Sequence, residues 1–419
     1  MKIPQRGHLW FHRDFKRLWL SDTVSQFGNQ FTSLALPILA VLSLKATAFE
    51  LGLLIGLQTV AFPILGLFVG VIADRLRKRP IMIVCNFGRM FTLATIPAAF
   101  LLSALTIYQL YLVAVINGVF TVFFEISYQS YLPVLVDRAD LVEGNAKLQT
   151  SWSGAQVVGP TLAGFVYEII GGALTIAVDA IGYLASALSL LSIRKREPKS
   201  HDDSMPRKGN FFAEMKEGIH IVFDNDVIKK IMFATATINF GNSIFQAVFV
   251  IFLLKMLLFT PAAIGILGTI TAVGFLLGAT VAPNFTRKMG LGRTIAITAF
   301  VPIIAMLQPL ALYGFAYLIM GTIGFVSGFV LPIYNINTVS LRQSIVPDQL
   351  QGRMNATVRT INWGTIPVGS FVGGILGTYI GIVPTILAGG ALGGTAVAWI
   401  IFSEVIHLNE MPIQEQLPT

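Results

Sequence analysis

Residues 48–103 read AFELGLLIGLQTVAFPILGLFVGVIADRLRKRPIMIVCNFGRMFTLATIPAAFLLS. Two long apolar runs, 48–73 and 80–103, lie on either side of a short break that is rich in arginine and lysine. A helix that crosses a bilayer needs roughly 20 apolar residues, whereas the strands of a membrane β-barrel alternate over segments of about ten. The stretch therefore predicts two membrane-spanning helices joined by a basic turn, because a helix satisfies its own backbone groups in lipid.

The same pattern of apolar runs and short polar breaks continues through the whole chain. Of its 419 residues, 54% are hydrophobic and 12% are charged, and the mean hydropathy is +0.73. Soluble domains carry about twice that share of charged residues, so a soluble enzyme or binding module is excluded. We predict an all-α membrane protein with twelve transmembrane helices in two six-helix bundles. The predicted spans are 16–43, 48–73, 80–103, 107–132, 146–170, 174–193, 227–255, 261–284, 291–310, 313–339, 356–380 and 383–405.

The basic residues indicate how the chain is oriented. Lys45 and Lys255 are the basic residues in the loops that follow odd-numbered spans, and the others lie in the N-terminal segment, in the even-numbered loops or at span ends beside them. The positive-inside rule then predicts that both termini and the even-numbered loops are cytoplasmic. The net charge of +8 is explained by this topology without a nucleic-acid partner. Cys85 is the single cysteine, so no disulfide can form within the chain.

A long polar loop predicts the domain organisation. Residues 194–226 contain a polar stretch and then a segment, 211–225, whose apolar residues recur at helical spacing. We predict an amphipathic helix on the cytoplasmic membrane surface, and a plain charged linker is the alternative. The loop divides the chain into an N-terminal six-helix bundle (1–193), a linker (194–226) and a C-terminal six-helix bundle (227–419).

The two halves of the sequence repeat at an offset of 210 residues. The matched positions are Gly118 with Gly328, Ile126 with Ile336, Ser130 with Ser340, Val136 with Val346, Asn145-Ala146 with Asn355-Ala356, Gly154 with Gly364, Gly159 with Gly369 and Gly164 with Gly374. A duplicated six-helix unit predicts two similar bundles. Transporters built from such repeats bind their substrates near the bilayer midplane between the repeats.

The basic turn after the second span carries a family resemblance. Gly70-Val-Ile-Ala-Asp74-Arg75-Leu-Arg77-Lys78-Arg79 resembles the Gly-x-x-x-Asp-Arg/Lys-x-Gly-Arg-Arg/Lys signature of the major facilitator superfamily, with Arg77 where the family often has glycine. The resemblance implies a conformational gate made by five residues. They are Gly70, Asp74, Arg75, Arg77 and Lys78.

A second motif lies in the fifth span, where Gly154, Gly159, Pro160 and Gly164 resemble the Gly-Pro-x-x-Gly-Gly signature of the family's antiporters. The resemblance implies export, and generic packing of small residues is the alternative. The stretch 131–146 resembles a branch that contains macrolide exporters and the enterobactin exporter. That branch implies efflux from the cell membrane, and the family implies a protein that works as a monomer. The chain lacks the Arg in the fourth span and the Asp before Ala35-Leu36-Pro37 that many drug exporters carry, so proton coupling does not follow from the resemblance. We predict proton-coupled efflux of amphipathic, drug-like compounds, and the residues within the spans are the basis for the coupling.

Charged residues within the spans are candidates for proton coupling, because a charge in the membrane is costly. Such residues are few. Away from the span ends they are Asp22, Arg89, Glu125 and Asp179. The resemblance implies that spans one, four, seven and ten line a central cavity, which favours Asp22 and Glu125. Burial between helices allows a carboxyl group to bind a proton near neutral pH, so we predict that these two residues carry protons.

Structural roles are the alternatives for these charged groups. Asp22 could be a carboxylate that stabilises a helix N-terminus, Glu125 could be the partner of Arg89, and Asp179 lies on a span that the resemblance does not place at the cavity.

The remaining cavity candidates are amides, tyrosines and one threonine on the same four spans. They are Gln26, Asn29, Gln30, Asn117, Tyr128, Asn239, Asn242, Gln246, Tyr334, Asn335 and Thr338. Within this set Asn239, Asn242 and Gln246 recur at helical spacing and share one face. Amides and aromatic rings in a large site suit a bulky amphipathic substrate, although hydrogen bonding between helices remains an alternative.

Catalytic and cofactor chemistry have no candidate residues in the predicted spans. All five histidines lie outside them, and no Gly-Lys-Ser/Thr phosphate loop occurs. We therefore predict no enzyme activity, metal site or cofactor. Export of one physiological solute, such as a siderophore or lipid-like molecule, is the nearest alternative function, and an importer is the next.

Overall fold

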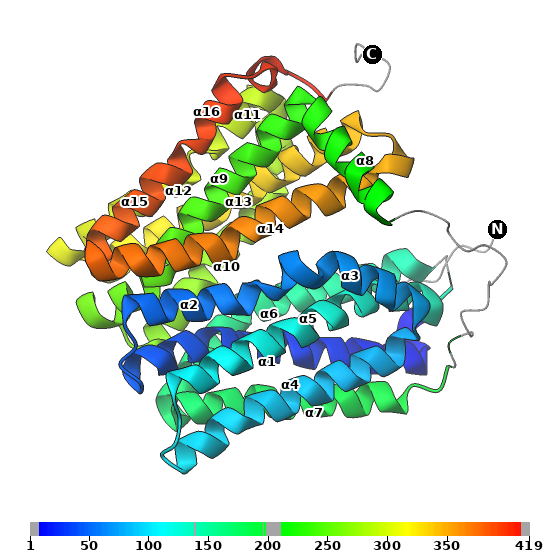
Figure 1. Ribbon diagram of the computed structural model, residues 1–419, viewed down its shortest axis with the longest axis vertical. Helices are drawn as coiled ribbons and strands as arrows, with labels where there is room; N and C mark the ends of the chain where they lie inside the picture. Colours follow the sequence, from blue (N-terminus) through cyan, green and yellow to red (C-terminus); the bar gives the residue numbers. More distant parts are fainter. Residues whose placement is uncertain (1–7, 138–139, 196, 198–210, 412–419) are drawn as a thin grey trace. The chain divides into compact units, whose positions relative to one another are not determined.

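The computed structural model describes residues 8–137, 140–195, 197 and 211–411, and these are almost entirely helical (Figure 1). No β-strand occurs among them. The α-helices are α1 (Arg13–Leu42), α2 (Ala48–Thr59), α3 (Ala61–Arg75), α4 (Lys78–Leu101), α5 (Ile107–Leu135), α6 (Leu141–Ile170), α7 (Gly172–Ser192), α8 (Phe211–Asp224), α9 (Asp226–Ile251), α10 (Pro261–Met289), α11 (Leu291–Thr298), α12 (Val301–Ile304), α13 (Ala316–Ile345), α14 (Asp348–Tyr379), α15 (Ile382–Gly394) and α16 (Ala396–Ile401). The all-α fold class is confirmed.

Nine stretches of helix in the described part of the chain are long and apolar enough to cross a membrane. They coincide with nine of the twelve predicted spans. The other three predicted spans are present as α1, α6 and α14, which are 30, 30 and 32 residues long and carry more polar residues. In α1 and α6 several of those polar residues line the cavity described below.

Two predicted spans are interrupted beside prolines. The second span divides into α2 and α3 because Pro63 lacks an N–H group and its ring would clash with the carbonyl group of Thr59, where α2 ends. Pro302 has the same relation to Thr298, the last residue of α11. The rest of that span continues through α12 into a 3₁₀ helix, Ala305–Tyr313.

The chain forms two compact units that differ from the predicted halves at two places. One unit contains α1, α3 to α7 and Thr260–Thr269, the first part of α10. The other contains Thr47–Thr59, α8, α9, the rest of α10 and the helices that follow. Each unit therefore includes one helical segment from the other half of the sequence.

Close contacts at glycines hold both of these segments. In the first unit, Gly164 of α6 lies so close to the backbone of Pro261 that an added Cβ would come within 2.5 Å of its carbonyl oxygen. In the second unit, Gly52 of α2 has the same relation to Ser370 of α14, again at 2.5 Å. Since α6 and α14 are equivalent in the sequence repeat, the two units use equivalent glycine-lined helices to bind the segments that they receive.

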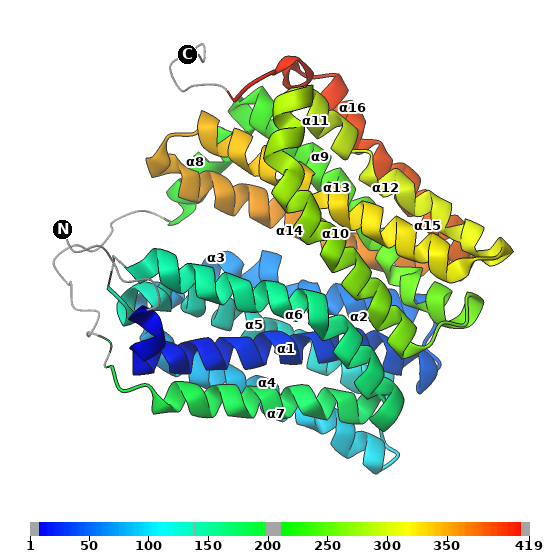
Figure 2. The same cartoon turned by 180° about the vertical axis from the view of Figure 1, so that it is seen from behind.

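The first unit is arranged around α1, which runs between α6 and α7 (Figure 2). Helix α4 packs on both α5 and α7, and α3 packs on α5. Phe15, Leu18, Leu132 and Leu190 are buried in the core of this unit near one end of the helices. The polar faces of α1, α5 and α6 meet beside this core.

The second unit is arranged around α9, which packs against α14 and α15. The predicted segment 211–225 is helix α8, and it lies against α14 through an ion pair between Glu217 and Arg353. Val222 on α8 is fully buried. Met215, Ile219 and Phe223 are exposed at helical spacing, which gives α8 an apolar outer face.

Candidate functional site

A cavity with a volume of about 660 Å³ lies within the first unit. Helices α1, α5 and α6 form its walls. The lining residues are Asp22, Gln26, Glu125, Tyr128, Gln129, Leu132, Asn145, Ala146, Leu148, Gln149 and Trp152. Both carboxylates that the sequence singled out therefore face the same cavity, together with amide and aromatic side chains.

Asp22 lies on the α1 wall and is almost fully buried, with 2% of its surface exposed. Its Oδ1 atom accepts a hydrogen bond from Nε2 of Gln26 at 3.3 Å, as their spacing of four residues on one helix face allows. The hydroxyl group of Tyr128 forms a further hydrogen bond with this carboxyl group. Asp22 is thus connected to the α5 wall of the cavity.

Glu125 lies on the α5 wall, on the same helix face as Tyr128, Gln129 and Leu132. Its carboxyl group is close enough to Asp22 for the two to repel each other when both are ionised. The ring of Tyr128 stacks on Phe124 with centroids 5.9 Å apart, which fixes its position in the wall. Two carboxyl groups with this mutual repulsion favour binding of a proton or a cation.

Arg89, considered above as a partner for Glu125, makes several contacts between helices. It is 1% exposed and donates hydrogen bonds to Oδ1 of Asn86 at 2.9 Å and to the hydroxyl group of Tyr183 at 3.3 Å. Its guanidinium group also lies over the rings of Phe124 and Tyr183, 4.3 and 4.5 Å from their centroids. These contacts give Arg89 a structural role at the junction of α4, α5 and α7.

The α6 wall contains lining residues that the sequence did not single out as binding residues. Asn145, Gln149 and Trp152 follow one another at helical spacing on a single face of α6. The signal was present in the sequence, because polar residues recur along one side of 145–152. It was missed because the family resemblance placed the cavity on spans one, four, seven and ten, whereas this face belongs to the fifth span.

Three other candidates from the first half of the sequence lie outside this cavity lining. Asn29 accepts a hydrogen bond from the hydroxyl group of Tyr183, and Gln30 donates one to Oε1 of Gln156 at 2.9 Å. The Oδ1 atom of Asn117 is buried without a hydrogen-bond partner. Asn29 and Gln30 thus join α1 to α7 and to α6, as helix-to-helix hydrogen bonds do.

The candidates from the second half lie in the second unit. Asn239 donates to the carbonyl oxygen of Asn362 at 3.0 Å. Tyr334 is buried and its hydroxyl group is hydrogen-bonded to Oγ1 of Thr235 at 2.9 Å. Thr338 is also buried and donates to the carbonyl oxygen of Tyr334. The remaining three are exposed on the surface of this unit, namely Asn242, Gln246 and Asn335.

Only part of the gate motif can be described. Gly70, Asp74 and Arg75 lie in α3, but the surroundings of these residues fall outside the described part of the structure. Arg77 is exposed and precedes α4, and Lys78 is the first residue of that helix.

The antiporter-like motif forms a helix contact in the first unit. Pro160 and Gly164 of α6 face Gly265, Gly268 and the start of α10. Thr161 and Thr269 share a hydrogen bond of 2.7 Å across this contact, and Gly159 packs against Gln30. Gly154, in contrast, has open space beside it. The motif therefore packs helices together, and its residues are not among those that line the 660 Å³ cavity.

Asp179, the fourth charged residue within the spans, is completely buried between α7 and α1. Thr32 donates a hydrogen bond to its Oδ2 atom. Its Oδ1 atom has no hydrogen-bond partner and lies directly against Gly28. This carboxyl group belongs to the interior packing of the unit. Among the residues that the structure describes, no group of His, Cys, Asp or Glu has the arrangement of a metal site.

Comparison with known proteins agrees with the fold and with a transport function. The family model "Major Facilitator Superfamily" matches residues 18–362. The multidrug efflux pump Tap of Mycolicibacterium fortuitum is 24% identical over 376 residues, which cover 86% of this chain and 88% of Tap. Macrolide efflux protein A of Streptococcus pyogenes is 22% identical over 381 residues, with coverage of 90% and 93%.

Solved structures of transporters share this fold. A mutant of the nucleoside transporter NupG superimposes with a TM-score of 0.77 at 15% identity, over 93% of this chain and all of NupG. A bacterial homologue of the iron transporter ferroportin, in its inward-facing state, gives a TM-score of 0.66 at 16% identity, over 93% of this chain and 99% of the homologue.

Proposed function

This chain belongs to the Major Facilitator Superfamily, and we propose that it exports amphipathic, drug-like compounds from the cell in exchange for protons. It is a multi-pass membrane protein and a transporter of small molecules, not an enzyme. Efflux rather than uptake is supported by the two similar efflux proteins and by the antiporter-like motif in α6.

The main support for proton coupling is the pairing of Asp22 and Glu125 on one cavity. Repulsion between two nearby carboxylates favours a state in which at least one of them is protonated. Binding of a cationic substrate beside them favours the ionised state and releases the proton. Substrate and proton would then compete for the same groups, and this competition produces exchange as the protein alternates between inward-open and outward-open states.

The chemistry of the cavity also supports an amphipathic substrate. Tyr128 and Trp152 offer aromatic faces, which attract both apolar groups and organic cations. Gln26, Gln129 and Gln149 offer adaptable hydrogen bonds. A site of this composition binds bulky compounds with an apolar body and a positive group better than it binds a small sugar.

The proposed orientation follows from the basic residues. They concentrate in the N-terminal segment and the even-numbered loops, which places both termini in the cytoplasm by the positive-inside rule. A monomer suffices for this mechanism, because the coupling groups all lie in one unit of one chain.

Removing the carboxylates tests the proposal. In cells that carry the protein, Glu125→Gln and Asp22→Asn should each lower the efflux of a cationic dye by about tenfold or more. An amide neither takes up a proton nor attracts a cation as a carboxylate does, and a charge-assisted contact is worth about 1.5–3 kcal/mol. Proton release on addition of dye to purified protein in vesicles should fall in parallel. The matched control is Glu410→Gln, an exposed carboxylate outside the cavity, which should leave both measurements unchanged.

Unchanged dye efflux and proton release in both cavity variants would refute these residues as the proton carriers. An uncoupler separates the proposed mechanism from the alternatives. If it abolishes efflux by the wild-type protein, proton coupling is supported, whereas dye accumulation above that of cells lacking the gene would indicate an importer. A screen with macrolides, tetracyclines, dyes and siderophores then distinguishes a broad exporter from one dedicated to a single solute.

A further inference from the structure

A second cavity lies in the first unit, at the end of α1 where the basic residues gather. Its volume is about 220 Å³, and it is lined by His12, Arg13, Asp14, Arg17 and Arg194. The first four come from the start of α1, and Arg194 comes from the segment that follows α7. Three arginines thus meet one carboxylate in a cavity formed by segments far apart in the sequence.

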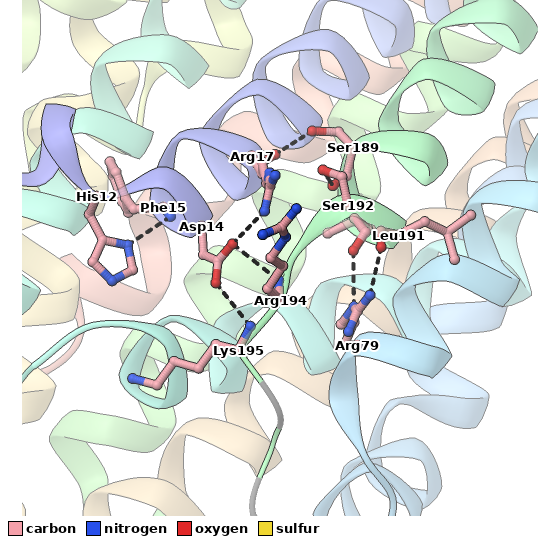
Figure 3. A network of polar contacts seen from close by, with 11 residues as sticks. His12, Asp14, Phe15, Arg17, Arg79, Ser189, Leu191, Ser192, Arg194 and Lys195 are labelled. Atoms are coloured by element: carbon pink, nitrogen blue, oxygen red, sulfur yellow. Dashed lines mark hydrogen bonds and ion pairs between the residues drawn. The ribbon is translucent and has the colours of Figure 1, made fainter.

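The carboxylate of Asp14 is fully engaged by groups of the protein (Figure 3). Its Oδ1 atom accepts hydrogen bonds from Nη1 of Arg17 at 2.8 Å and from the backbone N–H of Arg194 at 3.1 Å. Its Oδ2 atom accepts one from the backbone N–H of Lys195 at 2.9 Å. Asp14 therefore holds the segment after α7 against the start of α1. Its single negative charge neutralises only one of the three guanidinium charges.

Two of the three guanidinium groups have N–H donors that the described part of the protein does not use. Arg13 and Arg194 are exposed, and neither makes a side-chain hydrogen bond or ion pair within the described part of the chain. His12 accepts the backbone N–H of Phe15 through Nδ1 at 3.0 Å, which orients the ring and leaves Nε2 as its donor. The cavity thus combines a surplus of positive charge with unused N–H donors.

Aromatic residues mark this end of the unit as the membrane–water interface. Trp10 and Trp19 pack edge to face with centroids 4.9 Å apart, and Nζ of Lys147 lies 4.2 Å from the centroid of the Trp10 ring. Phe11 is 84% exposed. Tryptophan collects at the level of the lipid headgroups, and the adjacent basic residues place this interface on the cytoplasmic side.

We propose that this cavity binds the phosphate group of an anionic phospholipid of the inner leaflet. A guanidinium group presents paired N–H donors that match two phosphate oxygens, and basic pockets at the cytoplasmic ends of membrane helices suit anionic headgroups. The bound lipid would bridge Arg13, at the start of α1, and Arg194, which follows the end of α7.

Lipid binding by the purified full-length protein in a neutral detergent tests this proposal. Titration with phosphatidylglycerol and with phosphatidylcholine of the same chain length, followed by native mass spectrometry, gives an apparent affinity for each. The wild-type protein should bind phosphatidylglycerol more tightly. Arg13→Gln combined with Arg194→Gln should weaken that binding by about tenfold or more, as expected for two charge-assisted contacts.

The matched control removes two exposed basic residues of the second unit, Lys288→Gln with Arg293→Gln, and should change the affinity by less than about twofold, the scale of screened surface charge. Equal weakening by both double variants would overturn the proposal, because binding would then reflect general surface charge. Equal affinity of the wild-type protein for the two lipids would also overturn it. The unfolding temperature without lipid serves to show that both double variants are folded.

Two soluble probes distinguish a lipid from free phosphate. Inorganic phosphate and glycerol 3-phosphate carry the same recognition chemistry without acyl chains. If they compete only at concentrations far above that of phosphatidylglycerol, the lipid assignment is supported. If either one binds as tightly as the lipid does, the site takes a soluble phosphate and the assignment to a lipid is wrong.

Discussion

Gly28 shows how a single residue determines whether a charged group can be buried. The fully buried carboxyl group of Asp179 lies directly against the Gly28 backbone, and Thr32 on the next turn of α1 donates to its other oxygen. A side chain at position 28 would occupy the space of the Asp179 Oδ1 atom. The packing of α1 on α7 therefore depends on the absence of a Cβ atom at this one position.

Adding that Cβ atom should destabilise the protein. Gly28→Ala is expected to lower stability by about 1–3 kcal/mol, the usual effect of overpacking, and the unfolding temperature of the purified protein should fall. Gly154→Ala is the matched control, because the same change in α6 meets no atom within 4 Å, and alanine favours a helix more than glycine does. Equal unfolding temperatures for the two variants would contradict this account of Gly28.

Residue-level reasoning identified some of the candidate site from the sequence. Asp22 and Glu125 stood out because charges are rare within apolar spans. Gln26 and Tyr128 were named because they are an amide and an aromatic residue on spans that the family resemblance places at the cavity. The structure brings these four side chains to one cavity. Gln149 and Trp152 did not stand out, because helical spacing shows which residues share a face but not which neighbouring helix that face meets.

At the scale of elements, the segment after α7 is held in place by contacts at several helix ends. Asp14 accepts the N–H groups of Arg194 and Lys195, and Nζ of Lys195 donates to the carbonyl oxygen of Leu135 at the end of α5. Arg79 at the start of α4 donates to the carbonyl oxygens of Leu190 and Leu191 (Figure 3). These contacts hold the C-terminal end of α7 and the residues after it against α1, α4 and α5.

The Asp14 contacts should make part of the stability dependent on pH. Burial tends to raise the pKa of Asp14, but the N–H groups of Arg194 and Lys195 and the Arg17 side chain outweigh it, so its pKa lies below the usual 3.8. A carboxyl group with a lowered pKa stabilises the fold above its unfolded-state pKa, and this contribution disappears as the pH falls through the folded-state pKa.

Comparison of the wild-type protein with Asp14→Asn measures this contribution. At pH 7 the variant should be less stable by about 1–3 kcal/mol, because charge-assisted hydrogen bonds are weakened. The difference in unfolding temperature should shrink as the pH is lowered below about 4, where the unfolded aspartate becomes protonated. A difference that stays constant between pH 7 and pH 3 would show that Asp14 acts through packing and not through its charge.

The extent of the elements was easier to predict than their internal breaks. Hydropathy located the spans because each needs a long apolar run, and the amphipathic pattern located α8. The breaks at Thr59 and Thr298 were missed although Pro63 and Pro302 were visible in the sequence. Proline within a membrane helix is often tolerated, since neighbouring groups can satisfy the freed carbonyl group, so the residue alone does not decide the outcome.

At the scale of the whole molecule, the repeat in the sequence predicted two similar bundles but not the exchange of segments between the halves. Hydropathy treats every span alike and contains no information on which bundle a span joins. The glycines of α6 and α14 contained the signal, since Gly164 and Gly374 match in the repeat and each lies against an exchanged segment. Their role became clear only from the positions of Thr47–Thr59 and Thr260–Thr269.

The exchange predicts how the chain behaves when it is divided. If residues 1–204 and 205–419 are produced as separate chains, each should accumulate poorly alone, because the glycine faces of α6 and α14 lack the segments that cover them. Production of both together should restore accumulation several-fold, and a tag on one chain should purify the other. The measurement is immunoblotting of membranes and of the purified material.

Gly164→Leu in the same pair is the informative variant, because its side chain would collide with the backbone of Pro261. It should reduce recovery of the second chain relative to Gly352→Leu, which has open space at its Cβ position. Stable accumulation of each chain alone, without co-purification, would mean that the exchanged segments contribute little to either unit.

The exchanged segments also impose an order of events on biosynthesis. Ribosomes add about 5–20 residues per second, so the glycine face of α6 is completed on the order of 5–20 seconds before the start of α10 arrives to cover it. The interval between the synthesis of α2 and that of its partner α14 is about three times as long. During these intervals α6 and α2 must lie in the membrane without the segments that they later contact. Glycine is suitable at these positions, because a glycine face is small and apolar and is therefore stable in contact with lipid until the partner segment is inserted.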